Sequence, residues 1–503
     1  MTERESRPGR DRRGHQRPEQ RLRGGGRRSA QTPSERRRGA DPARNAAFDV
    51  LTEVSASDAY ANLVLPPLLR ERRIIGRDAG FATELTYGTL RMRGLYDAIL
   101  AKCLDRPIGA LDQPLLDVLR LGSHQLLAMR VADHAAVSET VALARARVGV
   151  GPAQMVNAVL RRVSEKPLDA WLTEVRDEAS SPVEASAIIG SHPEWIVRAL
   201  REALHGSGRD PAEIDDLLAA NNTPPKVSVA ARPGLVTAEE IRQSAPEWMT
   251  VEPGRWLEDA LTLGGGDPLV LPAIADGRAG VQDEGSQIAA LALAAAPITG
   301  PDEKWLDLCA GPGGKAALLA ALAAGRGAAL VANEALPHRA NLVRKALKAI
   351  PKSAVAEIRV GDGREIGQER PGAFDRVLVD APCTGLGALR RRPEARWRRT
   401  PADLAQLTGL QAELLASALM ATRPGGVVAY VTCSPHQAET RHVVDRVLRR
   451  GEVKAERIDA REVVQSIIRP DTPIDLGAGP DVQLWPHVHG TDAMHVTLLT
   501  RLA

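Results

Sequence analysis

Leu306-Asp-Leu-Cys-Ala-Gly-Pro-Gly-Gly-Lys315 is the stretch that decides the fold. Its first residues end a buried strand pattern, a glycine-rich turn follows, and residues 315–320 begin a helix pattern. Glycines let the backbone turn sharply and let a ligand approach the peptide groups closely. In doubly wound sheets of parallel strands, ligands bind at such a strand-to-helix turn. The stretch therefore predicts an α/β domain with a ligand site at this turn.

Strand and helix patterns alternate on both sides of the turn. Strand patterns cover residues 305–308, 328–333, 354–360, 376–379 and 427–431, and helix patterns cover residues 315–324, 337–349 and 404–422. This alternation is typical of a doubly wound, Rossmann-like sheet. We assign the domain to residues 279–503.

The remaining chain divides into three parts by pattern and composition. Residues 44–166 repeat apolar residues at helical spacing and predict an all-α domain. Residues 167–278 mix helix patterns with short strands, and we expect a small α+β module. Residues 1–43 have no hydrophobic period and are expected to be a disordered, Arg-rich tail.

Charge is distributed unevenly along the chain. Residues 1–40 carry 13 Arg and 5 acidic residues, a balance of +8, so the other residues sum to −5 within the total of +3. A basic arm ahead of an acidic body indicates a polyanionic partner. A solvated tail without a dedicated role is an equally good interpretation.

The composition also excludes several classes of protein. No apolar run resembles a signal peptide or reaches the roughly 18–20 residues that span a bilayer. The four cysteines lie far apart, without metal-ligand spacing. We expect a cytoplasmic protein with reduced thiols, no bound metal, no membrane contact and a monomeric state.

Two acidic residues suggest which ligand the glycine turn binds. Glu334 ends the next strand, 20 residues after Gly314, where a carboxylate can accept both hydroxyls of a ribose. Asp362 follows the third strand, where an adenine amino group would lie. The turn lacks the G-x-G-x-x-G spacing of dinucleotide sites. An adenosine-containing methyl donor therefore fits better than NAD, and a purely structural glycine turn is the alternative.

Two cysteines end neighbouring strands of the predicted sheet. Cys383 follows Asp380-Ala-Pro, and Cys433 follows the strand of residues 427–431. A thiolate that adds to C6 of a cytosine makes C5 nucleophilic enough to accept a methyl group. Asp380 could stabilise the charge at N3 if burial raises its pKa. The alternative is that both cysteines are small packing residues, the role we expect for Cys103 and Cys309.

These motifs together resemble a known family. The segments from residue 307 to 315, from residue 380 to 387, and Thr432-Cys-Ser-Pro are similar to the Sun/Nop-type RNA cytosine-C5 methyltransferases, most of all to the branch that acts on small-subunit (16S) ribosomal RNA. The resemblance covers nearly all of the chain after residue 44. It implies a NusB-like, RNA-binding domain at residues 44–166, S-adenosyl-L-methionine as cofactor and ribosomal RNA as partner.

The resemblance also implies roles for individual residues. Cys433 matches the family's nucleophile, and Cys383 matches the cysteine that helps to release the product; Asp380 and Lys315 complete the implied catalytic set. The implied cofactor contacts are Cys309, Ala310, Gly311, Pro312, Gly313, Gly314, Lys315, Glu334, Asp362 and Asp380. The chain departs from the family at Gly311, where Ala is common, and at residues 492–495, which read Asp-Ala-Met-His in place of Asp-Gly-Phe-Phe.

A basic segment directly follows the Asp380–Gly387 loop. Arginines can pair with phosphates and stack on unpaired bases, and a tryptophan can stack as well. We therefore expect RNA contacts from Arg390, Arg391, Arg392, Arg396, Trp397, Arg398 and Arg399. A solvated charged face is the alternative.

Three functions remain open from the sequence. The first is cytosine-C5 methylation of ribosomal RNA, and the second is the same chemistry on transfer RNA. The third is an RNA-binding assembly or antitermination factor with an inactive methyltransferase domain. Cys383, Cys433, Asp380 and Lys315 together argue against the third.

Overall fold

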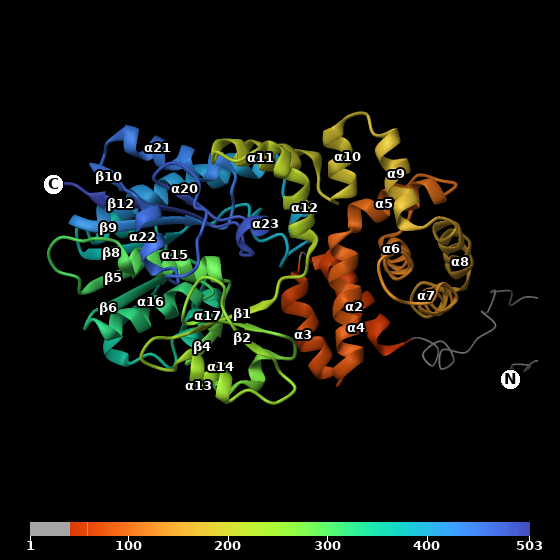
Figure 1. Ribbon diagram of the computed structural model, residues 1–503, viewed down its shortest axis with the longest axis horizontal. Helices are drawn as coiled ribbons and strands as arrows, with labels where there is room; N and C mark the ends of the chain where they lie inside the picture. Colours follow the sequence, from red (N-terminus) through yellow and green to blue (C-terminus); the bar gives the residue numbers. More distant parts are fainter. Residues whose placement is uncertain (1–40, 58) are drawn as a thin grey trace, which may run out of the picture.

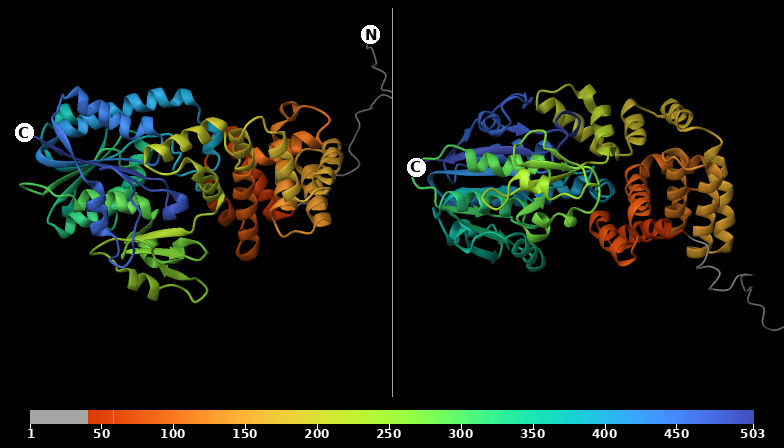
Figure 2. Two further views of the ribbon diagram at one scale, coloured as in Figure 1. Left: turned by 45° about the horizontal axis from the view of Figure 1, so that its top comes forward. Right: turned by 60° about the horizontal axis from the view of Figure 1, so that its bottom comes forward.

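The computed structural model describes residues 41–57 and 59–503, so the predicted tail of residues 1–43 lies almost entirely outside the described residues. The chain forms an elongated molecule with a helical domain at one end of the long axis and an α/β domain at the other (Figures 1 and 2). No helix in the described ranges is long and apolar enough to cross a membrane.

The helical domain packs amphipathic helices around one aliphatic core. Its helices are α2 (Pro42–Ser57), α3 (Ala61–Glu71), α4 (Gly76–Arg91), α5 (Arg93–Cys103), α6 (Gln113–Leu127), α7 (Asp133–Arg147) and α8 (Val150–Ser164). Leu51, Ile99, Leu119 and Leu160 are fully buried in this core. Cys103 packs into the same core, as expected.

The structure divides residues 167–278 differently from the expected single module. Helices come first: α9 (Leu168–Glu178), α10 (Pro182–Ile189), α11 (Glu194–Gly206) and α12 (Ile214–Asn222), and α11 and α12 bridge the two ends of the molecule (Figure 1). An antiparallel sheet in the order β2-β3-β1-β4 follows, built from β1 (Val227–Ala231), β2 (Val251–Pro253), β3 (Ala260–Leu263) and β4 (Ala279–Val281), with the short helices α13 (Ala238–Gln243) and α14 (Pro272–Asp276). β4 lies just beyond the expected boundary at residue 278, but its pairing with β1 makes it part of this sheet.

The α/β domain contains a mixed sheet in the order β10-β12-β9-β8-β5-β6-β7, with β11 paired to β12. Five strands are parallel: β5 (Lys304–Asp307), β6 (Ala329–Glu334), β7 (Val355–Val360), β8 (Phe374–Asp380) and β9 (Thr422–Thr432). The antiparallel strand β12 (His495–Arg501) joins β9 to β10 (Ala455–Ile458), and β11 (Val482–Gln483) extends β12. The strand order reverses between β5 and β8, which is where doubly wound sheets bind ligands.

Helices cover both faces of this sheet. One face packs against α15 (Glu284–Ala295), α16 (Gly314–Gly325), α17 (Pro337–Ala346) and α22 (Ala460–Ile467). The other packs against α18 (Ile366–Glu369), α20 (Pro401–Ala421) and α21 (Arg441–Arg450). The short helices α19 (Ala395–Arg398) and α23 (Pro486–His489) lie near the helical bridge. The chain therefore has the three kinds of structure that the sequence predicts, with a Rossmann-like α/β domain at its C-terminal end.

Candidate active site

A pocket of about 500 Å³ opens at the carboxyl ends of β5, β6, β8 and β9. The lining includes Cys309, Glu334, Asp380, Cys383 and Cys433, which sequence analysis placed at one edge of the sheet. Parallel strands bring these residues together because their carboxyl ends share that edge. These five residues are up to 124 positions apart in the sequence (433 − 309).

The two cysteines of the pocket are in direct contact. Cys383 Sγ and Cys433 Sγ lie 3.4 Å apart as free thiols. The hydrogen bond from Cys383 lowers the pKa of Cys433, and the Lys315 and Arg392 cations act in the same direction. The same hydrogen bond, burial and the Glu439 carboxylate raise the pKa of Cys383. Of the two, Cys433 is therefore the better thiolate and Cys383 the better proton donor.

An ion pair lies beside the cysteines. Lys315 Nζ, in the first turn of α16, donates to Asp380 Oδ2 at 2.8 Å. Burial favours the neutral amine, but the Asp380 carboxylate outweighs it and raises the pKa of Lys315. The ammonium therefore remains charged at neutral pH and provides a fixed positive charge near Cys433.

A buried carboxylate that sequence analysis missed links the two cysteine loops. Glu439 is fully buried and accepts from the Thr384 backbone amide at 2.8 Å and from the Ser434 hydroxyl at 2.7 Å. Thr384 and Ser434 each directly follow a cysteine of the pair. Glu439 thereby fixes the spacing of the loops. The only feature of the sequence that points to Glu439 is its position, six residues after Cys433.

The backbone of the glycine turn passes close to neighbouring residues, which leaves no room for a side chain at Gly311 or Gly313. Gly313 adopts φ +112°, a left-handed conformation that favours glycine, at the start of α16. A Cβ atom on Gly311 would lie 2.2 Å from Glu334 Oε2, which instead accepts from the Gly311 backbone amide at 3.0 Å. The predicted residues of the turn and Glu334 thus form one hydrogen-bonded unit.

Comparisons with known proteins agree with this geometry. The family model described as 16S rRNA methyltransferase RsmB/F matches residues 294–500, and the NusB family model matches residues 41–165. Ribosomal RNA small subunit methyltransferase B of Pseudomonas syringae pv. tomato is 31% identical, with 81% of this chain and 86% of that protein covered. The chain belongs to the RsmB/F family of methyltransferases.

One further relative and one solved structure are also similar to this RsmB/F member. A Mycobacterium tuberculosis protein, Rv1407, named provisionally as a methyltransferase, is 51% identical over 93% of this chain and 98% of its own length. The crystal structure of PH0851 has a TM-score of 0.74 at 21% identity and covers 92% of this chain and 99% of that one, which shows a shared fold. The RsmB/F family consists of RNA cytosine methyltransferases that use S-adenosylmethionine, and this member is one of them.

One unpaired, buried group next to the pocket-lining residue Leu308 fits that cofactor. Asp307, at the end of β5, is buried, and neither of its carboxylate oxygens has a hydrogen-bond partner among the described residues. Burial, with the nearby Asp380 carboxylate, raises the pKa of Asp307 to about 8. A buried acid without a partner suits a ligand that carries positive charge, as S-adenosylmethionine does on its amino group and sulfonium. Asp307 belongs to the glycine-turn motif, but nothing in the sequence alone predicts a role for it.

Two other predicted cofactor contacts line the pocket with partners of their own. The Glu334 carboxylate also accepts from the Leu336 backbone amide at 3.0 Å. Asp362 forms an ion pair with Arg364, with a shortest distance of 2.6 Å, which lowers the pKa of Asp362. A bound adenosine would have to share or displace these partners. Asp362 remains a predicted cofactor contact only because it lines the pocket.

Two residues of the arginine segment, Arg390 and Arg396, are buried within the protein. Arg390 is buried and pairs with Asp283 and Asp492 at 2.8 and 2.7 Å. Arg396 is fully buried and donates to backbone oxygens of two other segments. For these two residues the predicted RNA contact was wrong. The sequence alone cannot show that these arginines pair with carboxylates and carbonyls from distant segments.

Other members of the segment contact the protein or face the pocket. Arg391 pairs with Asp283 at 2.7 Å, and Arg398 donates to the Val54 carbonyl at 2.8 Å. Trp397 packs against the helical domain, where Arg93 lies 5.4 Å from the centre of its ring. Arg392 and Arg399 both line the pocket at the strand ends. RNA contact therefore stays a prediction for these two residues above all.

Proposed function

We propose that this protein methylates C5 of a cytosine in small-subunit ribosomal RNA, with Cys433 as nucleophile and Cys383 as the group that assists release. The observation that supports it best is the 3.4 Å contact between two free cysteines whose pKa values are shifted in opposite directions. A relative with 31% identity carries the name of such an enzyme. S-adenosylmethionine supplies the methyl group.

Residues in and beside the pocket can carry the attack on the base and the release of the product. The Cys433 thiolate adds to C6 of the cytosine, and the electron pair moves through the ring so that C5 becomes nucleophilic. The Lys315–Asp380 pair, beside Cys433, can bind the polar edge of the base that gains electron density. After C5 is methylated, its proton leaves to a base, the Sγ–C6 bond breaks, and Cys433 departs as a thiolate. The Cys383 thiol can donate a hydrogen bond to that thiolate.

Separate cysteine variants test the two roles. Cys433→Ala removes the nucleophile and should abolish methyl transfer from labelled S-adenosylmethionine to small-subunit ribosomal RNA. Cys383→Ala keeps the nucleophile, although without the hydrogen bond that lowers its pKa, and slows release, so a covalent protein–RNA adduct should accumulate on denaturing gels. Cys103→Ala is the matched control, because Cys103 lies in the helical core away from the pocket.

RNA with 5-fluorocytosine gives a direct measurement of the attacking sulfur, since fluorine cannot leave as the proton does. The wild type should be trapped, and the crosslinked peptide should contain Cys433. A peptide that contains Cys383 would reverse the assignment. Bisulfite sequencing of a deletion strain should show loss of one modified cytosine in ribosomal RNA; loss in transfer RNA alone would contradict the proposed substrate.

A further inference from the structure

One aromatic side chain of the catalytic pocket comes from the helical domain. Tyr60, the residue before α3, lines the pocket together with Asp380, Cys383 and Cys433. It is the only aromatic residue among the described residues that line this pocket. The ring is half-buried and contributes surface to the cavity. The active-site pocket is therefore built from both ends of the molecule.

The arginine segment after the Cys383 loop holds Tyr60 in this position. The guanidinium carbons of Arg392 and Arg398 lie 4.9 and 5.2 Å from the centre of the Tyr60 ring. Arg398 Nη2 donates to the carbonyl of Ala59 at 2.6 Å. Buried Glu394 accepts from the Ala61 backbone amide at 3.0 Å. The peptide groups on both sides of Tyr60 are thus fixed by the methyltransferase domain.

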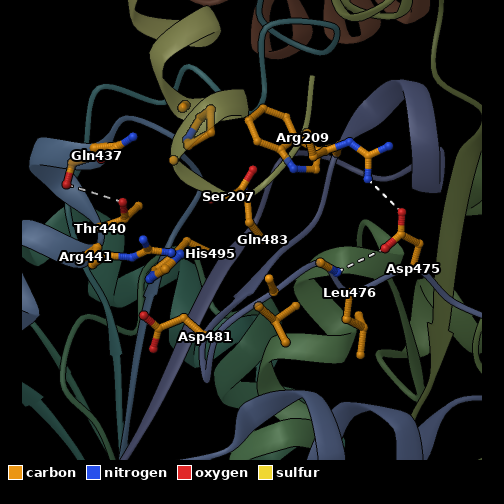
Figure 3. Close-up of a pocket in the computed structure, with 17 residues that line it drawn as sticks. Ser207, Arg209, Gln437, Thr440, Arg441, Asp475, Leu476, Asp481, Gln483 and His495 are labelled. Atoms are coloured by element: carbon orange, nitrogen blue, oxygen red, sulfur yellow. Dashed lines mark hydrogen bonds and ion pairs between the residues drawn. The ribbon is translucent and has the colours of Figure 1, made fainter. Parts of the chain in front are cut away.

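The chain's own closing segment supplies no aromatic ring to the pocket. Met494 and His495 occupy the positions of the family's Phe-Phe, and neither lines the catalytic pocket. His495 instead faces a separate, smaller cavity of about 30 Å³ between α11 and the C-terminal strands, near Arg441 and Asp481 (Figure 3). His495 is buried there and accepts or donates at Thr497 Oγ1, 3.0 Å away.

We propose that Tyr60 stacks on the target cytosine and holds it against Cys433, so that the helical domain completes the base-binding site. This inference rests on the proposed function of the same pocket. A base on which chemistry is done must leave its stack, and an aromatic face replaces the lost stacking. Arg392, which contacts Tyr60 and also lines the pocket, is placed to bind the adjoining phosphate.

Adduct formation tests the stacking. Small-subunit ribosomal RNA transcribed with 5-fluorocytidine is mixed with saturating enzyme and S-adenosylmethionine, and the rate of covalent adduct formation is measured. Tyr60→Ala should slow it roughly 5- to 150-fold, the usual effect of losing one stacked aromatic, whereas Tyr60→Phe should stay within about twofold because the ring remains. Leu63→Ala, on an exposed residue of the helix α3 that follows Tyr60, should match the wild type.

Photocrosslinking separates stacking from a merely structural role of Tyr60. RNA transcribed with 5-iodocytidine is irradiated with the Cys433→Ala variant, and the crosslinked peptide is mapped. We expect the peptide that contains Tyr60, and its loss in the double variant with Tyr60→Ala. A crosslink elsewhere, or an unchanged adduct rate in Tyr60→Ala, would overturn the inference. Absence of any wild-type adduct would instead contradict the proposed function, while the crosslink would still show whether Tyr60 meets a base.

Discussion

Asp307 shows how one residue can be costly for the fold and useful for binding. Its carboxyl is buried at the end of β5 without a hydrogen-bond partner in the described part of the chain, and the nearby Lys315 ammonium only partly offsets the effect of burial. The pKa rises to about 8, against about 4 in an unfolded chain. Folding therefore takes up a proton between these values, so the free energy of unfolding falls as pH rises from about 4 to about 8 and levels off above.

Asp307→Asn should remove this pH dependence. Relative to the wild type, the free energy of unfolding of the variant should rise by about 1–3 kcal/mol between pH 5 and pH 8, because the amide carries no charge to bury. Thermal denaturation over that pH range measures the change. Binding of S-adenosylmethionine, followed by calorimetry, should weaken on the order of tenfold through loss of a partner for its positive charge. A variant with the same pH profile as the wild type would show that Asp307 is already neutralised.

At the scale of the element, the strand-to-loop junctions determine the site. Gly387 lies where three segments meet: its amide donates to the Cys433 carbonyl at 2.9 Å, and its carbonyl accepts from the Ala493 amide at 2.9 Å. A Cβ atom there would lie 2.2 Å from the Ala493 carbonyl oxygen and 2.8 Å from that of Cys433. The departure of residues 492–495 from the family pattern leaves this backbone connection in place.

Gly387→Ala should therefore displace the Cys433 loop. We expect methyl transfer to fall on the order of 100-fold, since a shift of about 1 Å at a catalytic group has this effect, with cofactor binding nearly unchanged. Gly409→Ala is the control: its site in α20 is open, and alanine should stabilise the helix by about 0.5–1 kcal/mol. Equal activity of the two variants would mean that the Cys433 loop accommodates the added Cβ atom without displacing Cys433.

Strands and helices could be predicted from the sequence, whereas contacts between distant segments could not. Strand and helix periods placed Cys383 and Cys433 at one sheet edge because parallel strands leave no other arrangement. Glu439 and Tyr60 escaped prediction because a buried linking carboxylate and a ring from another domain have no local pattern. Arg390 and Arg396 were misassigned for a related reason: their burial depends on the partners Asp283 and Ser191, which lie more than 100 residues away in sequence.

On the scale of the whole molecule, the arginine segment joins the domains. Arg396 Nη1 donates to the carbonyls of Arg91 and Ser191 at 3.1 and 2.9 Å and to Asn222 Oδ1 at 2.8 Å. These acceptors belong to the helical domain, to the loop between α10 and α11, and to the end of α12. Burial lowers the pKa of Arg396 to about 9, so the guanidinium remains charged at neutral pH. One side chain of the methyltransferase domain thus orients the domain that carries Tyr60.

Arg396→Ala should loosen this junction more than it disturbs either domain. The loss leaves several buried oxygens without donors, so we expect the free energy of unfolding to fall by about 2–4 kcal/mol. Hydrogen exchange should accelerate in the α4–α5 turn and around Ser191, whereas the core of the parallel sheet should keep its protection. Arg449→Ala, at an exposed position of α21, serves as control and should change stability by less than about 0.5 kcal/mol. If both variants exchange and melt alike, the domains must be held together by apolar packing, and the hydrogen bonds of Arg396 contribute little to their orientation.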